Sequence, residues 1–330
     1  MTRIIITGGN GFIGRHLAEK ILSRTTDSVI LVSNTSKANN KYLEERKLLD
    51  DKKLKFYTAD IRDRNTIEDI MKDERADTCI HLAAKTSVAD SIKNPDETME
   101  INVKGTLNVL EACHTRRVNN FIFASSAAVY GDVTELPISE DHTLHPLSPY
   151  GTSKMLAEKH VSTYGQLKKI QNTISLRIFN AYGPGQTNES DVITKFAKRL
   201  SNGLPPIIYG NGNFTRDFIS VDDITEAILL SLRAMELPDN NLNDRLRYPA
   251  VLNVGTGIPT SIVELAHKMI DIFGLKLSPE HEQGNNSEGA ILHSYANTSK
   301  TKRALNFIAK TNLETGLRNM IERMQLSKAS

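Results

Sequence analysis

The sequence has no tryptophan, only two cysteines, and little excess of either charge. Its 330 residues contain 41 Lys and Arg against 39 Asp and Glu, a net charge of +2, which gives no reason to expect a nucleic-acid partner. No apolar run approaches the roughly 20 residues that cross a bilayer, and residues 4–6 form a short strand-like run rather than a signal peptide, so we expect no membrane partner. Cys79 and Cys113 lie in predicted buried elements, which favours reduced thiols in a cytoplasmic protein. The histidines have no spacing typical of a metal site, so we expect no metal.

The first half of the chain alternates predicted strands and helices. The strands are apolar throughout rather than alternating, which is typical of a parallel sheet covered on both faces. After Asn180 prolines and glycines separate shorter elements, and residues 236–250 are predicted to form a surface loop. We therefore predict an α/β fold, with a doubly wound parallel sheet in residues 1–180 and a smaller C-terminal α/β lobe in 181–330, some segments of which return to the first domain. The predicted strands are 3–7, 28–33, 54–58, 78–83, 119–125 and 173–179, and the main predicted helices are 12–24, 94–116, 148–169, 221–233, 261–273 and 312–323.

A glycine-rich turn, Gly8-Gly-Asn-Gly-Phe-Ile-Gly14, joins the first predicted strand to the first predicted helix. Its G-x-x-G-x-x-G spacing lets the backbone approach a pyrophosphate that lies on the helix N-terminus. Because the turn is the first βα connection of a doubly wound pattern, it predicts a Rossmann-type dinucleotide site. The cofactor contacts expected here are Gly8, Gly11, Phe12, Ile13 and Gly14.

The end of the second predicted strand bears on the choice of cofactor. An acidic residue about 20 positions beyond the glycines would bind the ribose 2′-hydroxyl and select NAD. The sequence instead has Ser33 and Asn34, followed by Lys37. These residues suit a plain ribose but would not repel a 2′-phosphate, so they leave NAD and NADP open. Asp60 and Ile61 follow the third strand, where Asp60 either accepts a hydrogen bond from adenine or caps the next helix.

Three residues suggest proton transfer coupled to hydride transfer. Tyr150 and Lys154 form a Y-x-x-x-K pair, and Ser126 lies 24 residues upstream of Tyr150. Ser148 and Pro149 predict a helix N-cap followed by proline at the first helical position. Tyr150 and Lys154 would then share one helical face near the positive end of the helix dipole. The ammonium group and the dipole both favour the phenolate, so we expect the pKa of Tyr150 to lie closer to neutrality than its usual ~10.

Spacing alone is weak evidence for that pair. Tyr164 and Lys168 have the same spacing further along the same predicted helix, without a capping signal before them. We expect this second pair to lie on a solvated face. The interpretation of Tyr150 depends on the residues around it.

In its motifs the chain resembles the extended short-chain dehydrogenases/reductases, specifically the NAD-dependent epimerase/dehydratase group, and within it the UDP-glucose 4-epimerases. The resemblance covers almost the whole chain. The matching segments are 7–14, 60–62, 81–85, 102–108, 125–131, 150–154, 176–180 and 216–223.

The resemblance implies roles for the candidate residues. Tyr150 would be the catalytic base, Lys154 would bind the nicotinamide ribose and acidify Tyr150, and Ser126 would steady the substrate hydroxyl. NAD would be the cofactor, and Asn102 would order the cofactor-side helix. His81 would pack near the cofactor without carrying a proton. The further cofactor contacts implied are Leu82, Ala83, Ala84 and Lys85, the last also near the substrate.

The resemblance also implies a nucleotide-sugar substrate in the C-terminal lobe. Asn180 and Arg216 would hold its diphosphate, a task that suits a guanidinium, and Tyr209 would lie near the base. The alternative for Arg216 is a surface ion pair with Asp217 or Asp222.

Two alanines narrow the reaction type. Dehydratases and decarboxylases of this group carry acidic residues directly after the catalytic Ser or Thr, where this chain has Ala127 and Ala128. A methyl group cannot transfer a proton, which favours redox chemistry at one carbinol carbon. The chain also departs from the group's pattern at Ser287, where an arginine is usual, and at Asn297, where an aspartate is usual.

These features predict a cytoplasmic, NAD-dependent nucleotide-sugar 4-epimerase acting on UDP-glucose, UDP-galactose or a related UDP-hexose. One alternative is an NADP-dependent 4-ketosugar reductase, which Ser33 and Lys37 would favour. Another is a non-catalytic cofactor-binding regulatory subunit, because this fold also supports such roles. The resemblance further implies a homodimer formed through the helices around 94–116 and 148–169.

Overall fold

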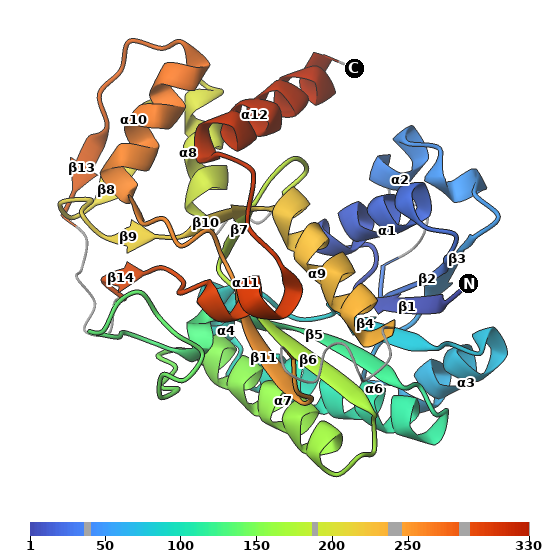
Figure 1. Cartoon of the computed structure of the whole chain (residues 1–330). Coiled ribbons are helices and arrows are strands. Elements are labelled where there is room, and N and C mark those ends of the chain that lie inside the picture. Colours follow the sequence, from blue (N-terminus) through green and yellow to red (C-terminus); the bar gives the residue numbers. More distant parts are fainter. Residues whose placement is uncertain (36–40, 187–190, 237–245, 284–290, 330) are drawn as a thin grey trace.

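A seven-stranded parallel sheet forms the centre of the molecule (Figure 1). The computed structural model describes residues 1–35, 41–186, 191–236, 246–283 and 291–329. The strand order β11-β6-β5-β4-β1-β2-β3 confirms the predicted doubly wound sheet. The strands are β1 (Arg3–Thr7), β2 (Ser28–Ser33), β3 (Leu54–Thr58), β4 (Thr78–His81), β5 (Asn120–Ser126), β6 (Asn172–Ile178) and β11 (Ala250–Val254).

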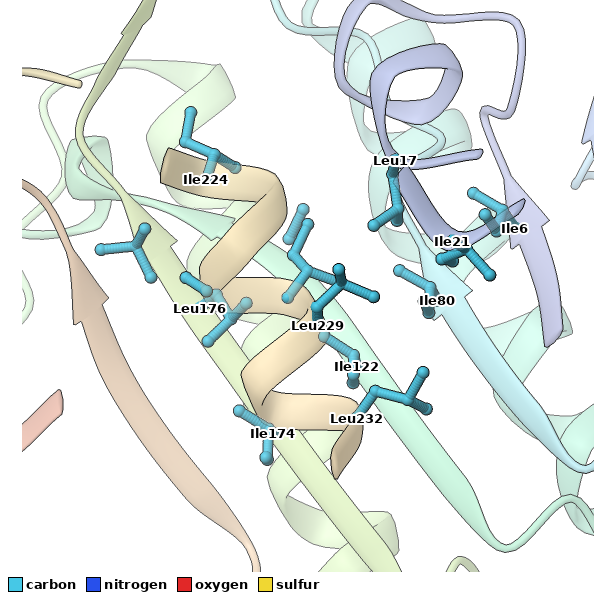
Figure 2. Packing of buried hydrophobic residues seen from close by; sticks show 14 of the residues in the cluster. Ile6, Leu17, Ile21, Ile80, Ile122, Ile174, Leu176, Ile224, Leu229 and Leu232 are labelled. Carbon is cyan, nitrogen blue, oxygen red and sulfur yellow. The ribbon is translucent and has the colours of Figure 1, made fainter. Parts of the chain in front are cut away.

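Both faces of the sheet are buried, which explains why its strands are apolar throughout. On β1, Ile4 and Ile6 belong to one core cluster and Ile5 to the other, as the two-residue period of a strand requires. Helices α1 (Phe12–Arg24) and α9 (Val221–Glu236) cover the first face. Figure 2 shows Leu17 and Ile21 of α1 and Leu229 and Leu232 of α9 in this layer, with Ile6, Ile80, Ile122, Ile174 and Leu176 of the sheet. The second face is covered by α3 (Arg64–Glu74), α6 (Gly105–Thr115) and α7 (Pro149–Gln166).

The helix predicted over residues 94–116 is interrupted. It consists of α5 (Pro95–Met99), a π-helical turn over Glu100–Lys104 and α6. The turn contains Asn102, and π turns are frequent at functional sites. The other described helices are α2 (Lys41–Glu45), α4 (Val88–Lys93), α8 (Val192–Leu200), α10 (Ile262–Phe273), α11 (Ser299–Leu305) and α12 (Leu313–Ala329), with short 3-10 helices over Leu48–Asp50 and Ala127–Val129.

A smaller lobe is built from the C-terminal half of the chain. Helices α8, α10 and α12 enclose a separate core cluster beside the sheet, at the upper left of Figure 1. From the same half, β11 forms an edge strand of the central sheet, and α9 packs on its face. A division into domains at residue 180 therefore remains a proposal. The lobe's short strands are β7 (Asn180–Tyr182), β8 (Ile207–Tyr209), β9 (Thr215–Arg216), β10 (Phe218–Ser220), β12 (Thr260–Ser261), β13 (Glu280–Glu282) and β14 (His293–Ser294).

The strand order places a ligand site at one edge of the sheet. The chain builds outward from β1 in one direction through β2 and β3, then from β4 in the other direction. Ligands of such sheets bind where the order reverses, outside the carboxyl ends of the strands. Most of the predicted surface loop, residues 237–245, lies outside the described residues. None of the described helices has the length and apolarity to cross a membrane.

Candidate active site

A large cleft opens at the carboxyl ends of the strands. Its volume is about 1270 Å³, above the ~1,000 Å³ upper range for a site that holds one small ligand. The cleft therefore has room for a cofactor and a second ligand. Most of the predicted site residues line it, namely Gly8, Gly11, Phe12, Ile13, Gly14, Ser33, Asn34, Asp60, Ile61, Leu82, Ala83, Ala84, Lys85, Ser126, Tyr150, Lys154, Asn180 and Arg216.

The glycine turn is shaped for close approach of a ligand to the backbone. Gly8 has φ +70°, and a Cβ there would lie 2.7 Å from the backbone nitrogen of Ala83. A Cβ on Gly14 would lie 2.5 Å from the Gly8 carbonyl oxygen, so the loop and α1 pack too closely for any side chain at this position. Gly11 caps α1 without a side chain, which leaves the first amides of the helix to a ligand. These features fit the pyrophosphate of a dinucleotide.

The end of the cleft beside β2 carries neutral side chains. Ser33, the last residue of β2, is buried, and its hydroxyl lies 3.1 Å from that of Thr35. Beyond β3, Asp60 accepts hydrogen bonds from the backbone and guanidinium of Arg62. The helix-cap alternative for Asp60 is wrong, because the carboxylate of Asp63 caps α3 instead. Lys37 lies outside the described residues.

Asn102 positions the segment after β4. Its side-chain oxygen accepts a hydrogen bond from the Lys85 amide at 2.7 Å, and its Nδ2 donates to the Lys85 carbonyl at 2.9 Å. The same Nδ2 lies 2.9 Å from the Ser153 hydroxyl on α7. Asn102 is buried away from the cleft lining, while the Lys85 ammonium pairs with Glu97 at the cleft. Asn102 therefore contributes to the site by holding the backbone of Lys85 in place.

The predicted Ser-Tyr-Lys group is brought together in the cleft. Ser148 caps α7 by accepting from the Gly151 amide at 3.1 Å, and Pro149 follows at the first helical position, as predicted. The Ser126 hydroxyl is close enough to the Tyr150 phenol to lower the pKa of Tyr150. Lys154 is 3% exposed and donates to the Ala124 carbonyl at 2.8 Å.

The expected lowering of the Tyr150 pKa is wrong for this structure. Burial raises the pKa of Tyr150, and the hydrogen bond with Ser126 offsets the rise only in part. Burial also lowers the pKa of Lys154 to about 7. Removal from water disfavours both charged forms, and here it outweighs the attraction that the Tyr150–Lys154 spacing suggested.

The predicted solvated face is wrong for Tyr164 of the second Y-x-x-x-K pair, while Lys168 is exposed as predicted. Tyr164 is 7% exposed and belongs to the core cluster under α7, where its hydroxyl donates to Glu111. Lys168 lies beyond the end of α7, with φ 54°. The tyrosine's apolar ring follows the buried stripe of the helix, which the sequence interpretation missed.

The two residues predicted to bind a diphosphate line the cleft together. Asn180 donates to the Asp217 carbonyl at 3.0 Å. Arg216 is directed at the carbonyl oxygens of Thr215, Ile291 and Leu292, and burial lowers its pKa.

The ion-pair alternatives for Arg216 are wrong in the described structure. The Asp217 carboxylate accepts instead from Thr256, Gly257 and Ala296. Asp222 is likewise no partner of Arg216, whose guanidinium is directed at backbone carbonyls.

Tyr209 and Asn297 do not line the cleft. Tyr209 is 58% exposed on β8 and is absent from that lining, so its contact with a nucleotide base remains a prediction. Ser287 lies outside the described residues. The Asn297 side chain accepts from the Ser299 amide at 3.0 Å, before α11.

His81 is a buried neutral side chain, as expected. Its Nδ1 lies 2.6 Å from the Thr7 hydroxyl and its Nε2 lies 2.9 Å from the Thr106 hydroxyl. Burial, and secondarily the charge of Lys154, lowers the pKa of His81 to about 3. The imidazole therefore joins β1, β4 and α6 rather than carrying protons.

A buried ion pair behind the site was missed by the sequence analysis. The carboxylate of Glu158 on α7 lies 2.6 Å from the guanidinium of Arg177 on β6, and both side chains are about 5% exposed. Glu158 also accepts from the hydroxyl of Ser125, the neighbour of Ser126, at 2.6 Å. Glu158 lies one helical turn beyond Lys154, so the extended spacing Y-x-x-x-K-x-x-x-E was the available signal.

A hydrogen-bond network extends from this ion pair to β11 at the edge of the sheet. Arg177 donates to the Tyr130 hydroxyl at 3.0 Å and to the Glu140 carbonyl at 2.9 Å. The Tyr130 hydroxyl donates to Asn253 on β11 at 2.6 Å. The network therefore connects the helix that carries Tyr150 to three strands and to the segment after Ser126.

Several cleft residues carried no distinguishing sequence signal. Helix α4 contributes Val88 and Ile92, which are 43% and 65% exposed and line the cleft. The cleft is also lined by Lys195 of α8 and by Asp191, the N-cap of that helix. These residues come from loops and short helices, whose placement depends on the tertiary structure rather than on a local motif.

The fold and the site together define a dinucleotide-binding α/β protein with a Ser-Tyr-Lys group at the carboxyl edge of its sheet. The family model "NAD dependent epimerase/dehydratase family" matches residues 4–255. The chain belongs to this family.

Similar proteins cover the chain from end to end. A putative UDP-glucose 4-epimerase of Methanocaldococcus jannaschii is 34% identical, with 98% of each chain covered. The crystal structure of a Thermotoga maritima UDP-glucose 4-epimerase with UDP-glucose has a TM-score of 0.86 and 31% identity, covering 99% of this chain and 100% of that one. A UDP-N-acetylglucosamine 4-epimerase of Methanobrevibacter ruminantium, in complex with UDP-N-acetylmuramic acid, has a TM-score of 0.86 and 29% identity, with 99% of each chain covered.

We predict that Glu158→Gln destabilises the protein by about 3–5 kcal/mol, because it leaves the buried Arg177 guanidinium without its counter-charge. Urea unfolding measures the change. Glu314→Gln is the matched control, since its pair with Arg318 is half-exposed and is screened by solvent, so its loss should change stability little. Equal losses in the two variants would contradict the importance assigned to the buried pair.

We predict that His81 makes the fold acid-sensitive. Its folded pKa of about 3 lies below the unfolded value of about 6.5, so the unfolded state binds the extra proton. The His81 contribution is complete above pH 6.5 and is lost as the pH falls from 6.5 towards 3, by about 1.4 kcal/mol per pH unit. Urea unfolding between pH 7 and about pH 4 should show a shallower loss in His81→Gln than in the wild type or in His267→Gln, an exposed control. Three parallel profiles would refute this assignment.

Proposed function

We propose that this protein is a nucleotide-sugar 4-epimerase that acts on UDP-glucose, UDP-galactose or a related UDP-hexose. The proposal depends on one observation: Ser126, Tyr150 and Lys154 lie together in a cleft with room for two ligands. In the sequence, Ser126 is followed by Ala127 and Ala128, which also line this cleft. Family membership and the similarity to 4-epimerases support the same activity.

Tyr150 exchanges a proton with the C4 hydroxyl of the sugar. NAD held by the glycine turn and Lys154 would supply reversible hydride transfer at C4. As the C4–H bond breaks, the Tyr150 phenolate takes the hydroxyl proton and a C4 ketone remains on the sugar. Return of the hydride to the other face of the ketone would invert C4, and Tyr150 then gives the proton back to the oxygen. Protons and electrons balance over the cycle, so no external oxidant is needed.

Ser126 and Lys154 support this proton transfer. The Ser126 hydroxyl, within hydrogen-bond reach of Tyr150, steadies the C4 oxygen. Lys154, buried beside the Phe123 ring, is placed to bind the nicotinamide ribose and to favour the phenolate when protonated. Because burial raises the pKa of Tyr150, formation of the phenolate depends on the positive charge of Lys154.

The alanines after Ser126 favour epimerisation over elimination. The Ser126 oxygen accepts from the Ala128 amide at 3.2 Å, which fixes the turn that carries Ala127 and Ala128 into the cleft lining. Loss of water from the sugar would need an acid and a base at this place, and methyl groups supply neither.

Arg216 and Asn180 hold the substrate by its diphosphate. Both line the cleft, and a guanidinium binds phosphate oxygens through paired hydrogen bonds. Holding the nucleotide rather than the sugar leaves the ketone free to turn over, so binding energy from the remote group supports the reaction.

We predict that the purified protein inverts C4 of at least one substrate among UDP-glucose, UDP-galactose, their N-acetyl forms and UDP-uronic acids. Tyr150→Phe should retain bound cofactor and lose at least about 100-fold in kcat, because the base is removed. Tyr164→Phe is a matched control, as Tyr164 lies in the core away from the cleft lining. Chromatography of the sugar nucleotides and mass spectrometry of the cofactor give the two readings. No inversion with intact cofactor would exclude the epimerase, and an active Tyr150→Phe variant would remove Tyr150 from its role.

An NADP-dependent 4-ketosugar reductase is the second candidate. The observation that favours it is the absence of a carboxylate at Ser33 and Asn34, where selection of NAD over NADP is usual. Net consumption of NADPH with a 4-ketosugar, without C4 inversion of any UDP-hexose, would establish this reaction instead.

The protein is proposed to work as a cytoplasmic homodimer. Leu156, on α7, is 39% exposed, and α7 packs against the π turn and α6, which supports an interface on these helices. Cys79 and Cys113 are buried free thiols, which suits a reducing compartment. Light scattering should give a dimer mass for the wild type and a monomer mass for Leu156→Arg, while Leu204→Arg, at an exposed position on the other lobe, should stay dimeric. A monomeric wild type would contradict the proposal.

A further inference from the structure

We propose that Asp217 is a positioning residue of the diphosphate subsite, which it organises without touching a ligand. The inference rests on the proposed function, because that function assigns the diphosphate to Asn180 and Arg216. Asp217 lies directly after Arg216, between β9 and β10, and its side chain is fully buried. It is absent from the cleft lining, so it acts on a ligand only through its neighbours.

The main chain of Asp217 joins two segments that line the cleft. Its carbonyl oxygen accepts from the amide of Asn180 and from Nδ2 of the same residue, both at 3.0 Å. Its own amide donates to the Ser294 carbonyl at 2.9 Å. Asn180, Ser294 and Arg216 all line the cleft, so the position of one backbone unit decides where these three lining residues lie.

The carboxylate of Asp217 holds this backbone unit in place. Its Oδ1 accepts from the Thr256 amide at 2.8 Å and from the Thr256 hydroxyl at 2.6 Å. Its Oδ2 accepts from the Gly257 amide at 2.9 Å and from the Ala296 amide at 3.1 Å. The donors belong to the turn after β11 and to the segment after β14. Burial raises the pKa of Asp217, and these hydrogen bonds oppose the rise by stabilising the carboxylate.

Arg216 depends on the same arrangement. Carbonyl oxygens rather than carboxylates are its partners among the described residues, at 2.8 Å for both Thr215 and Ile291. A buried cation held by carbonyl groups alone keeps its charge available to an anionic ligand. Ile291 belongs to the segment that leads through β14 to Ala296. Asp217 therefore orders both the residue before it and the segment that this residue binds.

Replacement by asparagine tests the hydrogen-bonded carboxylate with little change in shape. A carboxylate accepts on both oxygens, whereas the Asn side chain has one oxygen and one NH₂ group. In either orientation the NH₂ group of Asp217→Asn would face a backbone amide that also donates, from Thr256 or from Gly257. We expect this conflict to displace the backbone at position 217, and with it the side chains of Asn180 and Arg216.

Asp223 on α9 provides the matched control. It is also buried, and its carboxylate accepts from the amides of Lys310 and Thr311 at 2.9 and 3.0 Å. Asparagine there meets the same conflict with backbone donors, but neither Asp223 nor its two partners line the cleft. Asp223→Asn should therefore lower the Tm as Asp217→Asn does, without weakening the ligand.

The test measures UDP binding by calorimetry, at a temperature well below the Tm of every variant. We expect the Kd for UDP to rise at least about tenfold in Asp217→Asn and to stay within about threefold of wild type in Asp223→Asn, because only the first displaces groups that hold the ligand. In turnover, Asp217→Asn should raise KM and keep kcat within about threefold, the pattern of lost uniform binding. Bound NAD, released by denaturation and quantified by mass spectrometry, should be unchanged in both variants.

A milder variant keeps the test available if Asp217→Asn does not fold. Thr256→Val removes one donor and leaves the carboxylate, and it should raise the Kd for UDP at least about threefold. The inference is overturned by equal UDP affinity in the two asparagine variants, by an unchanged Kd in Thr256→Val, or by a wild type that does not bind UDP. A wild type that binds UDP but inverts no UDP-hexose contradicts the proposed function alone, so the two failures are distinguishable.

Discussion

The buried ion pair between Glu158 and Arg177 is the interaction on which the geometry of the site depends. It holds α7, which carries Tyr150, against β6. Glu158 also accepts a hydrogen bond from Ser125 on β5, the residue directly before Ser126. Burying two charges is costly unless their remaining hydrogen-bonding groups are satisfied. Here Ser125 and Tyr130 satisfy them, so the pair fixes one relative position of helix and strands. That position brings the phenol and the hydroxyl within reach of each other.

Desolvation is the main cause of the pKa shifts of Tyr150, Lys154 and His81. Burial raises the pKa of Tyr150, lowers that of Lys154 to about 7, and keeps His81 neutral. The three shifts share their largest cause, because removal from water disfavours the charged form of each group. In the proposed mechanism, Tyr150 therefore depends on the Lys154 ammonium to reach the phenolate form.

The sequence predicted those parts of the molecule that local patterns determine. The doubly wound sheet followed from apolar strands alternating with helices, and the cap on α7 followed from Ser148 before a proline. The glycine turn was predictable because only glycine tolerates the close packing at Gly8. Features that depend on partners far along the chain were not predictable. The burial of Tyr164 and the pairing of Glu158 depend on which elements pack against α7, and the raised pKa of Tyr150 depends on the water that this packing excludes.

The central claim is that one hydride leaves C4 of the sugar and returns to the same carbon on its other face. The most direct test is to incubate the protein with UDP-hexose labelled with deuterium at C4 and to locate the label in the epimerised product by mass spectrometry and NMR. We expect inversion with the deuterium retained at C4, since the hydride is returned from the bound nicotinamide. Inversion with loss of the label to water would contradict it.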